Sequence, residues 1–376
     1  MALDVAENSD QLVVDLLHLD VVEAMLKRWQ ITYNSITAYD RDERLGLARL
    51  RDLRDAAGQP LDVGELTALL RQRCAAERDG WTPTIGRNRD VYAVIGESHK
   101  PMSIGAVGAA SHKPMAGGEP RPFPGDLPRV ETTPTAGEGV RVGLVDTRAA
   151  DPGTYPVPYR SGHALFVRGL IEAYAPKADV VEQPVLDPHD GHAGSWDTAQ
   201  AIMTLAGEHR LDILNLSLGC FTIAGGPPLV IARAIERLGP DVLVIAAAGN
   251  HGEIVALTDG HDRGSATWPA GISSVAAIGA VDNLLGTPPW SPALPWVRYA
   301  APGVDVVSTY LRAEKVDVNG RIRKFEGKAK WSGTSFAAAI ASGSIAARTR
   351  PGSVTAREAL AAMVEAGNGP VRERPR

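Results

Sequence analysis

The stretch VRVGLVD, residues 140–146, is a short apolar run that ends at a single aspartate. Four similar runs follow it, and three segments of helix length separate the first four. Continuous apolar strands joined by crossover helices predict a doubly wound α/β fold, with a mostly parallel sheet covered by helices on both faces. The expected strands are 140–146, 178–185, 211–219, 241–250 and 273–282, and the expected helices are 163–174, 195–209 and 227–238.

The composition is that of an ordinary globular protein, with 44% hydrophobic and 22% charged residues. A formal net charge of −5 gives no reason to expect a nucleic acid or an anionic membrane as partner. Cys74 and Cys220 are the only cysteines and are expected in different domains, which argues against a disulfide framework and fits a reducing compartment. The acidic N-terminus does not resemble a secretory signal, and no apolar run approaches the ~18–20 residues of a membrane span. We therefore expect a cytoplasmic protein.

The 376 residues are enough for two domains, and residues 10–96 have a pattern of their own. Strand-like and helix-like segments alternate in the order βαββαβ, which is the split βαβ pattern of a small ferredoxin-like α+β domain. The expected strands are 11–17, 31–39, 45–53 and 89–96, and the expected helices are 20–29 and 62–74.

Residues 97–138 are rich in Gly, Pro, Ser and Ala and predict a flexible linker before the larger domain at 139–366 and a tail at 367–376. The linker contains SHKPM twice. Its two histidines, His99 and His112, have Lys and Pro as neighbours, so a local duplication is favoured over a metal site.

The stretch KWSGTSFAAAIASG, residues 330–343, raises a question about Ser335, which opens a run of small helix-forming residues. A helix that begins at a serine places the hydroxyl beside unsatisfied backbone N–H groups and the positive end of the helix dipole. That position suits a nucleophile whose reaction generates an oxyanion. The alternative is a serine-capped core helix that packs closely through its small residues.

Three further polar residues stand where expected strands end or helices begin. Asp146 ends the first run, His163 follows seventeen positions later in SGHALFVRG, and Asn250 ends the fourth run. Ligands of parallel sheets bind outside the carboxyl ends of the strands. Asp, His and Ser are the parts of a nucleophilic triad, and Asn supplies a neutral N–H donor for an oxyanion. Separately, each has a structural alternative as a helix cap, a core histidine or a turn residue.

From these residues the chain resembles the subtilisin-like serine peptidases over roughly 139–366, and it has their Asp…His…Ser order. Three further segments are similar to segments of that family. ILNLSLG is similar to the substrate-binding strand, ATWPAGISSVAAIGAVD to the segment after the oxyanion Asn, and WVRYAAPGVDVVST to the segment before the serine. The resemblance implies a serine endopeptidase that needs no cofactor for catalysis. It implies that Asp146 orients the imidazole, His163 is general base and acid, Ser335 is the nucleophile, and Asn250 and the Ser335 N–H form the oxyanion hole.

The sequence departs from the family pattern at several positions, none of which removes a proton-transferring or oxyanion-binding group. Gly-Thr is usual after the histidine, Ala is usual at 168, Gly at 148 and Pro at 339. Here these positions hold Ala164, Leu165, Arg168, Arg148 and Ala339.

Two related classes compete with an active subtilisin-like peptidase. The acid-acting sedolisins also carry an SGTS serine, but they use carboxylates in place of the histidine and Asp in place of the oxyanion Asn. His163 and Asn250 therefore favour the subtilisin branch. The other alternative is a catalytically silent peptide-binding or scaffold protein on the same fold.

The resemblance also implies where a peptide substrate binds. Ser217, Leu218 and Gly219 are expected to form an edge strand and a wall of the primary pocket, and Cys220 is expected to be a thiol near the cleft without a catalytic role. The loop 251–264 carries Glu253, Asp259 and Asp262, which either favour a basic substrate residue or are solvated loop charges. Many relatives bind structural calcium, but no matching calcium loop is recognisable.

Subtilisin-like precursors resemble the whole arrangement, because a βαββαβ prodomain and a flexible junction precede their catalytic domain. The resemblance implies that residues 10–96 act as intramolecular inhibitor and folding template. Self-cleavage is then expected between about Glu97 and Gly139, where the linker composition begins and ends. The alternative is an accessory domain that is never released.

Overall fold

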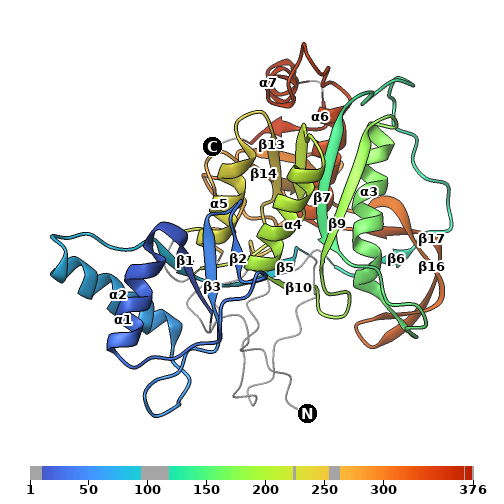
Figure 1. The fold of residues 1–376 in the computed structure, drawn as a ribbon. Coiled ribbons are helices and arrows are strands. Elements are labelled where there is room, and N and C mark those ends of the chain that lie inside the picture. The colour runs from blue at the N-terminus through green and yellow to red at the C-terminus, as the bar shows by residue number, and fades with distance from the viewer. Residues whose placement is uncertain (1–10, 95–117, 223–225, 254–262, 368, 375–376) are drawn as a thin grey trace. The chain divides into compact units, whose positions relative to one another are not determined.

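The computed structural model describes residues 11–94, 118–222, 226–253, 263–367 and 369–374. These residues divide into two compact units. The first unit consists of 1–90 together with 194–203 and 226–237, and the second unit contains the rest of the chain. Figure 1 shows the ribbon coloured along the chain.

The first unit contains an antiparallel sheet whose elements follow the predicted order β–α–β–β–α–β. Its strand order is β2-β3-β1-β4, so the first and third strands of the chain order lie in the centre. The elements are β1 (Leu12–Asp15), α1 (Leu19–Arg28), β2 (Arg41–Asp42), β3 (Leu47–Leu50), α2 (Val63–Glu77) and β4 (Ile85–Arg87), with a 3₁₀ turn at Leu16–His18 after β1.

Two strand predictions in this unit are wrong. Residues 31–39 are not a strand, because the Asp40 carboxylate accepts hydrogen bonds from the backbone N–H and hydroxyl of Thr37 and closes a turn there. The last strand of the sheet is β4, and not 89–96. Strand β5 (Asp90–Ala93) pairs instead with β12 (Leu218–Gly219). Alternating apolar residues indicate a strand but not its partner.

Both faces of the N-terminal sheet are covered within the first unit. Helices α1 and α2 pack on one face, with Leu12 and Val14 of β1 in the shared core. Asp15 points to the opposite face, where its carboxylate pairs with Arg233 Nη2 of α5 (Leu229–Leu238) at 2.8 Å. A side chain at Gly86 would lie 2.9 Å from Leu229 Cβ, so β4 approaches α5 closely.

The start of helix α4 (Ser195–Glu208) is also bound by the N-terminal segment. Asn88 Oδ1 accepts hydrogen bonds of 2.8 Å from the Trp196 N–H and from the Ser195 hydroxyl, and so satisfies donors at the helix terminus. Arg49 is buried, pairs with Asp40 at 3.0 Å and lies over the Trp196 ring. Residues 11–90 therefore contact two helices that belong, in chain order, to the larger domain.

The second unit is built on a seven-stranded sheet in the order β18-β15-β14-β13-β11-β7-β9, in which only β18 is antiparallel. Four of the five predicted strands are confirmed with small shifts of their ends, whereas 211–219 divides into β11 of this sheet and β12, which pairs with β5. Strand β7 has β9 on one side and β11 on the other, so the strands that follow β7 in the chain lie on opposite sides of it. Ligands of parallel sheets bind at such reversals of strand order. The strands are β7 (Arg141–Thr147), β9 (Asp179–Leu186), β11 (Ile213–Leu216), β13 (Leu243–Ala247), β14 (Ala276–Val281), β15 (Tyr299–Pro302) and β18 (Arg372–Glu373).

Two helices of the second unit carry predicted site residues at their starts. Helix α3 (His163–Tyr174) begins at the predicted histidine, and α6 (Thr334–Ala346) begins one residue before Ser335. Every residue of α6 is buried, and α6 packs against α3 and the central strands. The C-terminal helix α7 (Ala356–Ala366) also contacts α6.

A long hairpin that the sequence analysis does not predict precedes α6. Its strands are β16 (Val306–Val318) and β17 (Arg321–Trp331), with β8 (Val157–Pro158) and β6 (Arg121–Pro122) at the edges. The linker prediction for 97–138 therefore needs a correction at its C-terminal end. Residues Arg121–Pro122 add a strand to β17, and Trp331 Nε1 donates to Gly118 O at 2.7 Å. Backbone hydrogen bonds order this part despite its composition.

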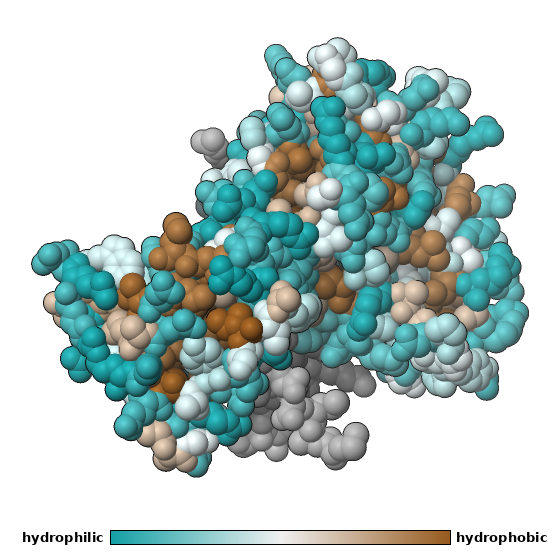
Figure 2. All heavy atoms as spheres, in the orientation of Figure 1, coloured by the Kyte–Doolittle hydropathy of each residue, from teal (hydrophilic) through white to brown (hydrophobic). Residues whose placement is uncertain are grey.

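No helix in the described ranges has the length and apolarity needed to cross a membrane. Figure 2 shows hydrophilic residues over much of the face drawn, with hydrophobic residues gathered in smaller groups. The expected cytoplasmic location stays a prediction.

The contact between α3 and α6 gives a test of the packing. A Cβ at Gly343 would lie 2.6 Å from the carbonyl oxygen of Ile171, so Gly343→Ala forces the two helices apart. We expect the free energy of unfolding to fall by about 1–3 kcal/mol. The matched control is Gly207→Ala in α4, where a Cβ meets no atom within 4 Å. That change should leave stability unchanged or raise it by up to about 1 kcal/mol. Equal urea midpoints for the two variants would contradict the close packing.

Candidate active site

The structure gathers the predicted catalytic residues at one edge of the parallel sheet. Asp146 lies near the end of β7, Asn250 follows β13, and His163 and Ser335 lie at the starts of α3 and α6. All four side chains are buried. The site thus lies at the carboxyl ends of the strands, next to the point where the strand order reverses.

Asp146 and His163 form a buried pair. The Asp146 Oδ1 lies 2.6 Å from His163 Nδ1 and also accepts the Thr147 N–H at 2.6 Å. A carboxylate at this distance selects the tautomer with the proton on Nδ1 and leaves Nε2 as an acceptor. Among the residues that the structure describes, Nε2 has no hydrogen-bond partner. The imidazole is therefore oriented with a proton-accepting nitrogen available.

Aromatic side chains surround the imidazole. The Trp331 ring meets that of His163 edge to face at 5.8 Å between centroids, and the Phe336 ring lies at 5.6 Å. Tyr310 packs against Trp331, and burial raises the pKa of its phenol well above the ordinary value, so Tyr310 stays neutral. The sequence analysis missed this enclosure. The signals present were the aromatic residues of the hairpin and the phenylalanine directly after Ser335.

Ser335 points its hydroxyl at two backbone carbonyl groups. The Oγ atom lies 2.9 Å from Val94 O and 3.2 Å from Ser217 O. Because His163 Nε2 has no partner in the described part of the chain, the hydroxyl is not hydrogen-bonded to the imidazole here. Ser335 lies in the first turn of α6, which directs N–H groups and the positive end of the dipole at the same place.

The side-chain amide of Asn250 has one orientation that satisfies its neighbours. Its Oδ1 accepts the Thr334 N–H and the Thr334 hydroxyl, each at 3.0 Å. The Nδ2 group therefore faces the other way and donates to Val94 O at 3.1 Å. Val94 O thus lies where donors from Asn250 and Ser335 converge.

The residue at this point belongs to a short segment of the protein's own chain. Strand β5 lies between β12 and β10 (His192–Gly194). In β5, Ala93 pairs with Leu218 and Tyr92 with Gly219. The Val94 N–H donates to Ser217 O at 3.2 Å. The predicted peptide-binding edge, Ser217 to Gly219, therefore holds an extended segment, and Val94 ends it beside Ser335.

The two arginines that depart from the family pattern have carboxylate partners of their own. Arg168 pairs with Glu172 at 2.7 Å and with Glu182 at 3.1 Å and is partly exposed. Arg148 pairs with Asp187 at 3.1 Å. These charges form surface ion pairs, so they do not disturb the Asp146–His163 contact.

Several other predicted features lie apart from this arrangement or outside the described residues. Cys220 follows Gly219, is buried and forms no disulfide. Within the described ranges no group of three or more His, Cys, Asp or Glu side chains could hold a metal ion. Outside them lie His99, His112, Asp259, Asp262 and the first part of the expected cleavage range.

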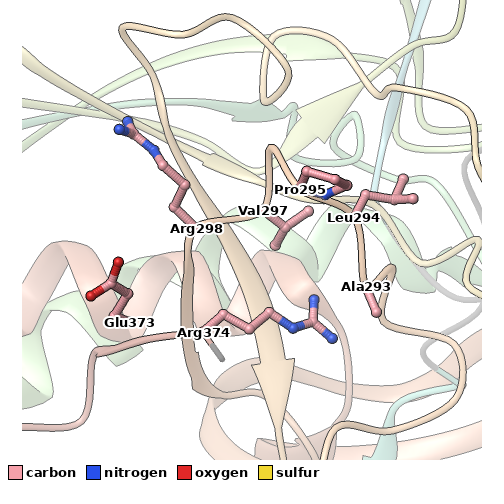
Figure 3. A pocket seen from close by; sticks show the side chains of 7 residues that line it. All are labelled: Ala293, Leu294, Pro295, Val297, Arg298, Glu373 and Arg374. Atoms are coloured by element: carbon pink, nitrogen blue, oxygen red, sulfur yellow. The ribbon is translucent and has the colours of Figure 1, made fainter. Parts of the chain in front are cut away.

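A cavity of about 460 Å³ at the C-terminal end of the chain contains none of the predicted site residues. Figure 3 shows Arg374 extending from beside β18 toward Ala293, with Leu294, Pro295 and Val297 on the neighbouring loop.

Comparison with known proteins agrees with this geometry. The model of the subtilase family matches residues 154–368, so the chain belongs to that family and is a subtilisin-like serine endopeptidase that acts on peptides or proteins. The match includes His163, Asn250 and Ser335 but begins after Asp146. The expected subtilisin-like α/β fold is thereby confirmed.

The chain is also similar to curated proteases. Subtilisin Savinase of Lederbergia lenta is 28% identical over 209 residues, which cover 49% of this chain and 71% of Savinase. The thermostable alkaline protease of Halalkalibacterium halodurans is 29% identical over 209 residues, 49% of this chain and 53% of that protein. Among solved structures, the prenylagaramide maturation protease PagA is similar with a TM-score of 0.46 and 23% identity, covering 63% of this chain and 80% of that one.

The polar contacts that orient Asn250 give a second test. Thr334→Val removes a buried hydroxyl that accepts the Gly249 N–H at 3.2 Å and lies 3.0 Å from Asn250 Oδ1. We expect the free energy of unfolding to fall by about 1–3 kcal/mol, because buried partners are left unsatisfied. The control is Ser344→Ala in the same helix, where the buried hydroxyl has no partner among the described residues. It should change stability little, and an equal loss in both variants would refute the role of the Thr334 contacts.

Proposed function

We propose that this chain hydrolyses peptide bonds through an acyl-enzyme, with Asp146, His163 and Ser335 as the triad and Asn250 in the oxyanion hole. The observation that carries the proposal is the position of Val94 O, which accepts hydrogen bonds from Ser335 Oγ and Asn250 Nδ2 at 2.9 and 3.1 Å. A substrate carbonyl must occupy this place for a serine to attack it while an amide N–H stabilises the oxygen.

Each residue has a distinct part in the reaction. Ser335 Oγ attacks the carbonyl carbon, and His163 Nε2 takes the hydroxyl proton. Asp146 holds the Nδ1–H and stabilises the imidazolium that forms. The carbonyl oxygen becomes an oxyanion and accepts the Asn250 N–H. As the C–N bond breaks, His163 returns the proton to the departing amine, and water then hydrolyses the ester by the same route. The reaction needs no cofactor.

One rotation precedes the attack. The Ser335 hydroxyl is hydrogen-bonded to two carbonyl oxygens. Proton transfer requires a hydrogen bond from this hydroxyl to His163 Nε2 instead. A turn about the Cα–Cβ bond exchanges one staggered rotamer for another. Catalytic hydrogen bonds are often incomplete before the reacting complex forms, so this geometry is compatible with the proposed role.

We also propose that the first substrate is the chain itself, cut after Val94. Val94 is buried, its carbonyl lies at Ser335, and β5 runs along the peptide-binding edge as an extended substrate does. This position precedes the range from Glu97 to Gly139 that the linker composition suggests. The linker composition indicates only a range that is accessible to cleavage. The hydrogen bonds of Ser335 support one particular peptide bond as the cleavage site.

Residues 10–94 would act as an inhibitor after this cut. The N-terminal sheet contacts α4 and α5 through Asn88 and through the Asp15–Arg233 pair. The tail at Val91–Val94 fills the edge that a substrate would use. A product held by both contacts leaves slowly, which keeps the cleft closed until the segment is removed.

The nucleophile is tested by Ser335→Ala. We expect peptide hydrolysis to be abolished with the fold intact, and loss of the serine lowers turnover by about 10⁶ in subtilisin, the enzyme on which that magnitude was measured. Parental activity in Ser335→Ala would refute the assignment.

Asn250→Ala should lower turnover by roughly 10²–10³ with little change in KM, the range reported for the same role in subtilisin. Turnover is measured on a fluorogenic peptide.

The processing site is tested by the mass and N-terminal sequence of the purified protein. Wild type should yield a fragment beginning at Ile95, and Ser335→Ala should stay at full length. Val94→Asp should slow the cut by at least about tenfold, because a carboxylate would enter a buried apolar position. The control is Leu17→Asp, a residue 89% exposed in the N-terminal segment, which should process normally. A new N-terminus between 98 and 139, or full activity without any cut, would overturn the site.

A further inference from the structure

A second cavity lies beside the aromatic residues that enclose His163. It has a volume of about 310 Å³ and is lined by three arginines, one glutamate and the end of strand β17. The lining residues are Gly118, Glu119, Arg121, Arg321, Arg323, Trp331 and Ser332.

The charges of this cavity are positive in sum. Arg323 pairs with Glu119 at 3.2 Å, and Arg121 pairs with Asp305. Arg321 is exposed and makes no ion pair with a described residue. The hairpin 306–331 carries seven Lys and Arg against three Asp and Glu, although the whole chain has a net charge of −5. A local positive field therefore covers one cavity of an acidic protein.

Two lining residues, Trp331 and Ser332, connect the cavity to the candidate site. His163 hands its proton to the departing amine, so residues around its ring lie beside that amine. Trp331 contacts this ring and also lines the cavity. Ser332, another lining residue, precedes Ser335 by three positions and so lies within about 11 Å of it. The opposite, acyl side is held by β5 on β12.

An extended substrate that passes Ser335 can span this upper limit within a few residues. A strand advances about 3.3 Å per residue, so the third residue after the scissile bond lies about 10 Å from it. In the chain's own sequence that third residue after Val94 is Glu97. It is the only acidic residue between 95 and 117.

We propose that this cavity is a subsite for an acidic substrate residue on the leaving-group side, near the third position after the cleaved bond, with Arg321 as its main charge. The proposal rests on the endopeptidase function proposed above. The substrate carboxylate replaces water and solvent anions beside Arg321, while Arg323 remains paired with Glu119. The preference acts on peptide binding and orientation, and no proton transfer depends on it.

The test compares peptides that differ at one position. Quenched fluorescent peptides containing Val-Tyr-Ala-Val-Ile-Gly-X, with X as Glu, Gln or Lys, are cleaved by the processed enzyme after residues 10–94 have been removed. We expect kcat/KM for Glu to exceed that for Gln about threefold to fivefold, the effect of one partly exposed ion pair, and Lys to be poorest. The preference should largely vanish at about 1 M salt, where the screening length is about 3 Å.

Matched variants locate the effect. Arg321→Gln should bring the ratio of kcat/KM for the Glu peptide to that for the Gln peptide close to one. The Gln peptide itself should be cleaved as before. The control is Lys324→Gln on the same strand, whose ammonium pairs with Glu314 and Glu326 and does not line the cavity. It should keep the ratio. Glu119→Gln should raise the ratio, because it releases Arg323.

The outcomes separate the two proposals. If the three peptides are cleaved equally well, or if Arg321→Gln keeps the parental ratio, the subsite is refuted and the endopeptidase function stands. If no peptide is cleaved although the protein is folded and processed samples are used, the endopeptidase function fails and the subsite fails with it.

Discussion

Two hydrogen bonds to one carbonyl oxygen organise the candidate site. Val94 O accepts from Ser335 Oγ and from Asn250 Nδ2, and all three groups are buried. Buried polar groups need partners, so the direction of the Asn250 amide is fixed by what its oxygen accepts from Thr334. A segment of the chain's own N-terminal part thereby lies against Ser335 and Asn250, and the proposals on processing and inhibition rest on that contact.

The precision of this arrangement depends on close packing between helices. Asp146 is fixed by β7, whereas His163 and Ser335 stand at the starts of α3 and α6. These helices approach closely because Gly343 has no side chain where it meets Ile171. Interiors are packed as densely as crystals, so a shift of one helix would change the separation of imidazole and hydroxyl. The small residues of α6 that make Ser335 conspicuous in the sequence thus serve the packing as well.

Much of the site could be predicted because its residues end strands or begin helices. The ends of apolar runs and the starts of helices single out Asp146, His163, Asn250 and Ser335, and the resemblance to a known family supplies the roles proposed for them. The place of Val94 could not be predicted, because the apolar run VYAVIG indicates a strand without its partner, and β12 lies more than a hundred residues away. The basic cavity could not be predicted for the same reason, because its arginines come from β6 and β17, which meet only through long-range strand pairing.

The most direct measurement of the central claim is covalent labelling by a fluorophosphonate, which reacts only with an activated serine. In the processed protein, once residues 10–94 have been removed, the account predicts one labelled peptide, containing Ser335, found by mass spectrometry. The label should be absent in His163→Ala, which lacks the base but keeps the serine. A folded, processed protein that takes no label, or one labelled equally without His163, would contradict the account and favour a silent peptide-binding protein on the same fold.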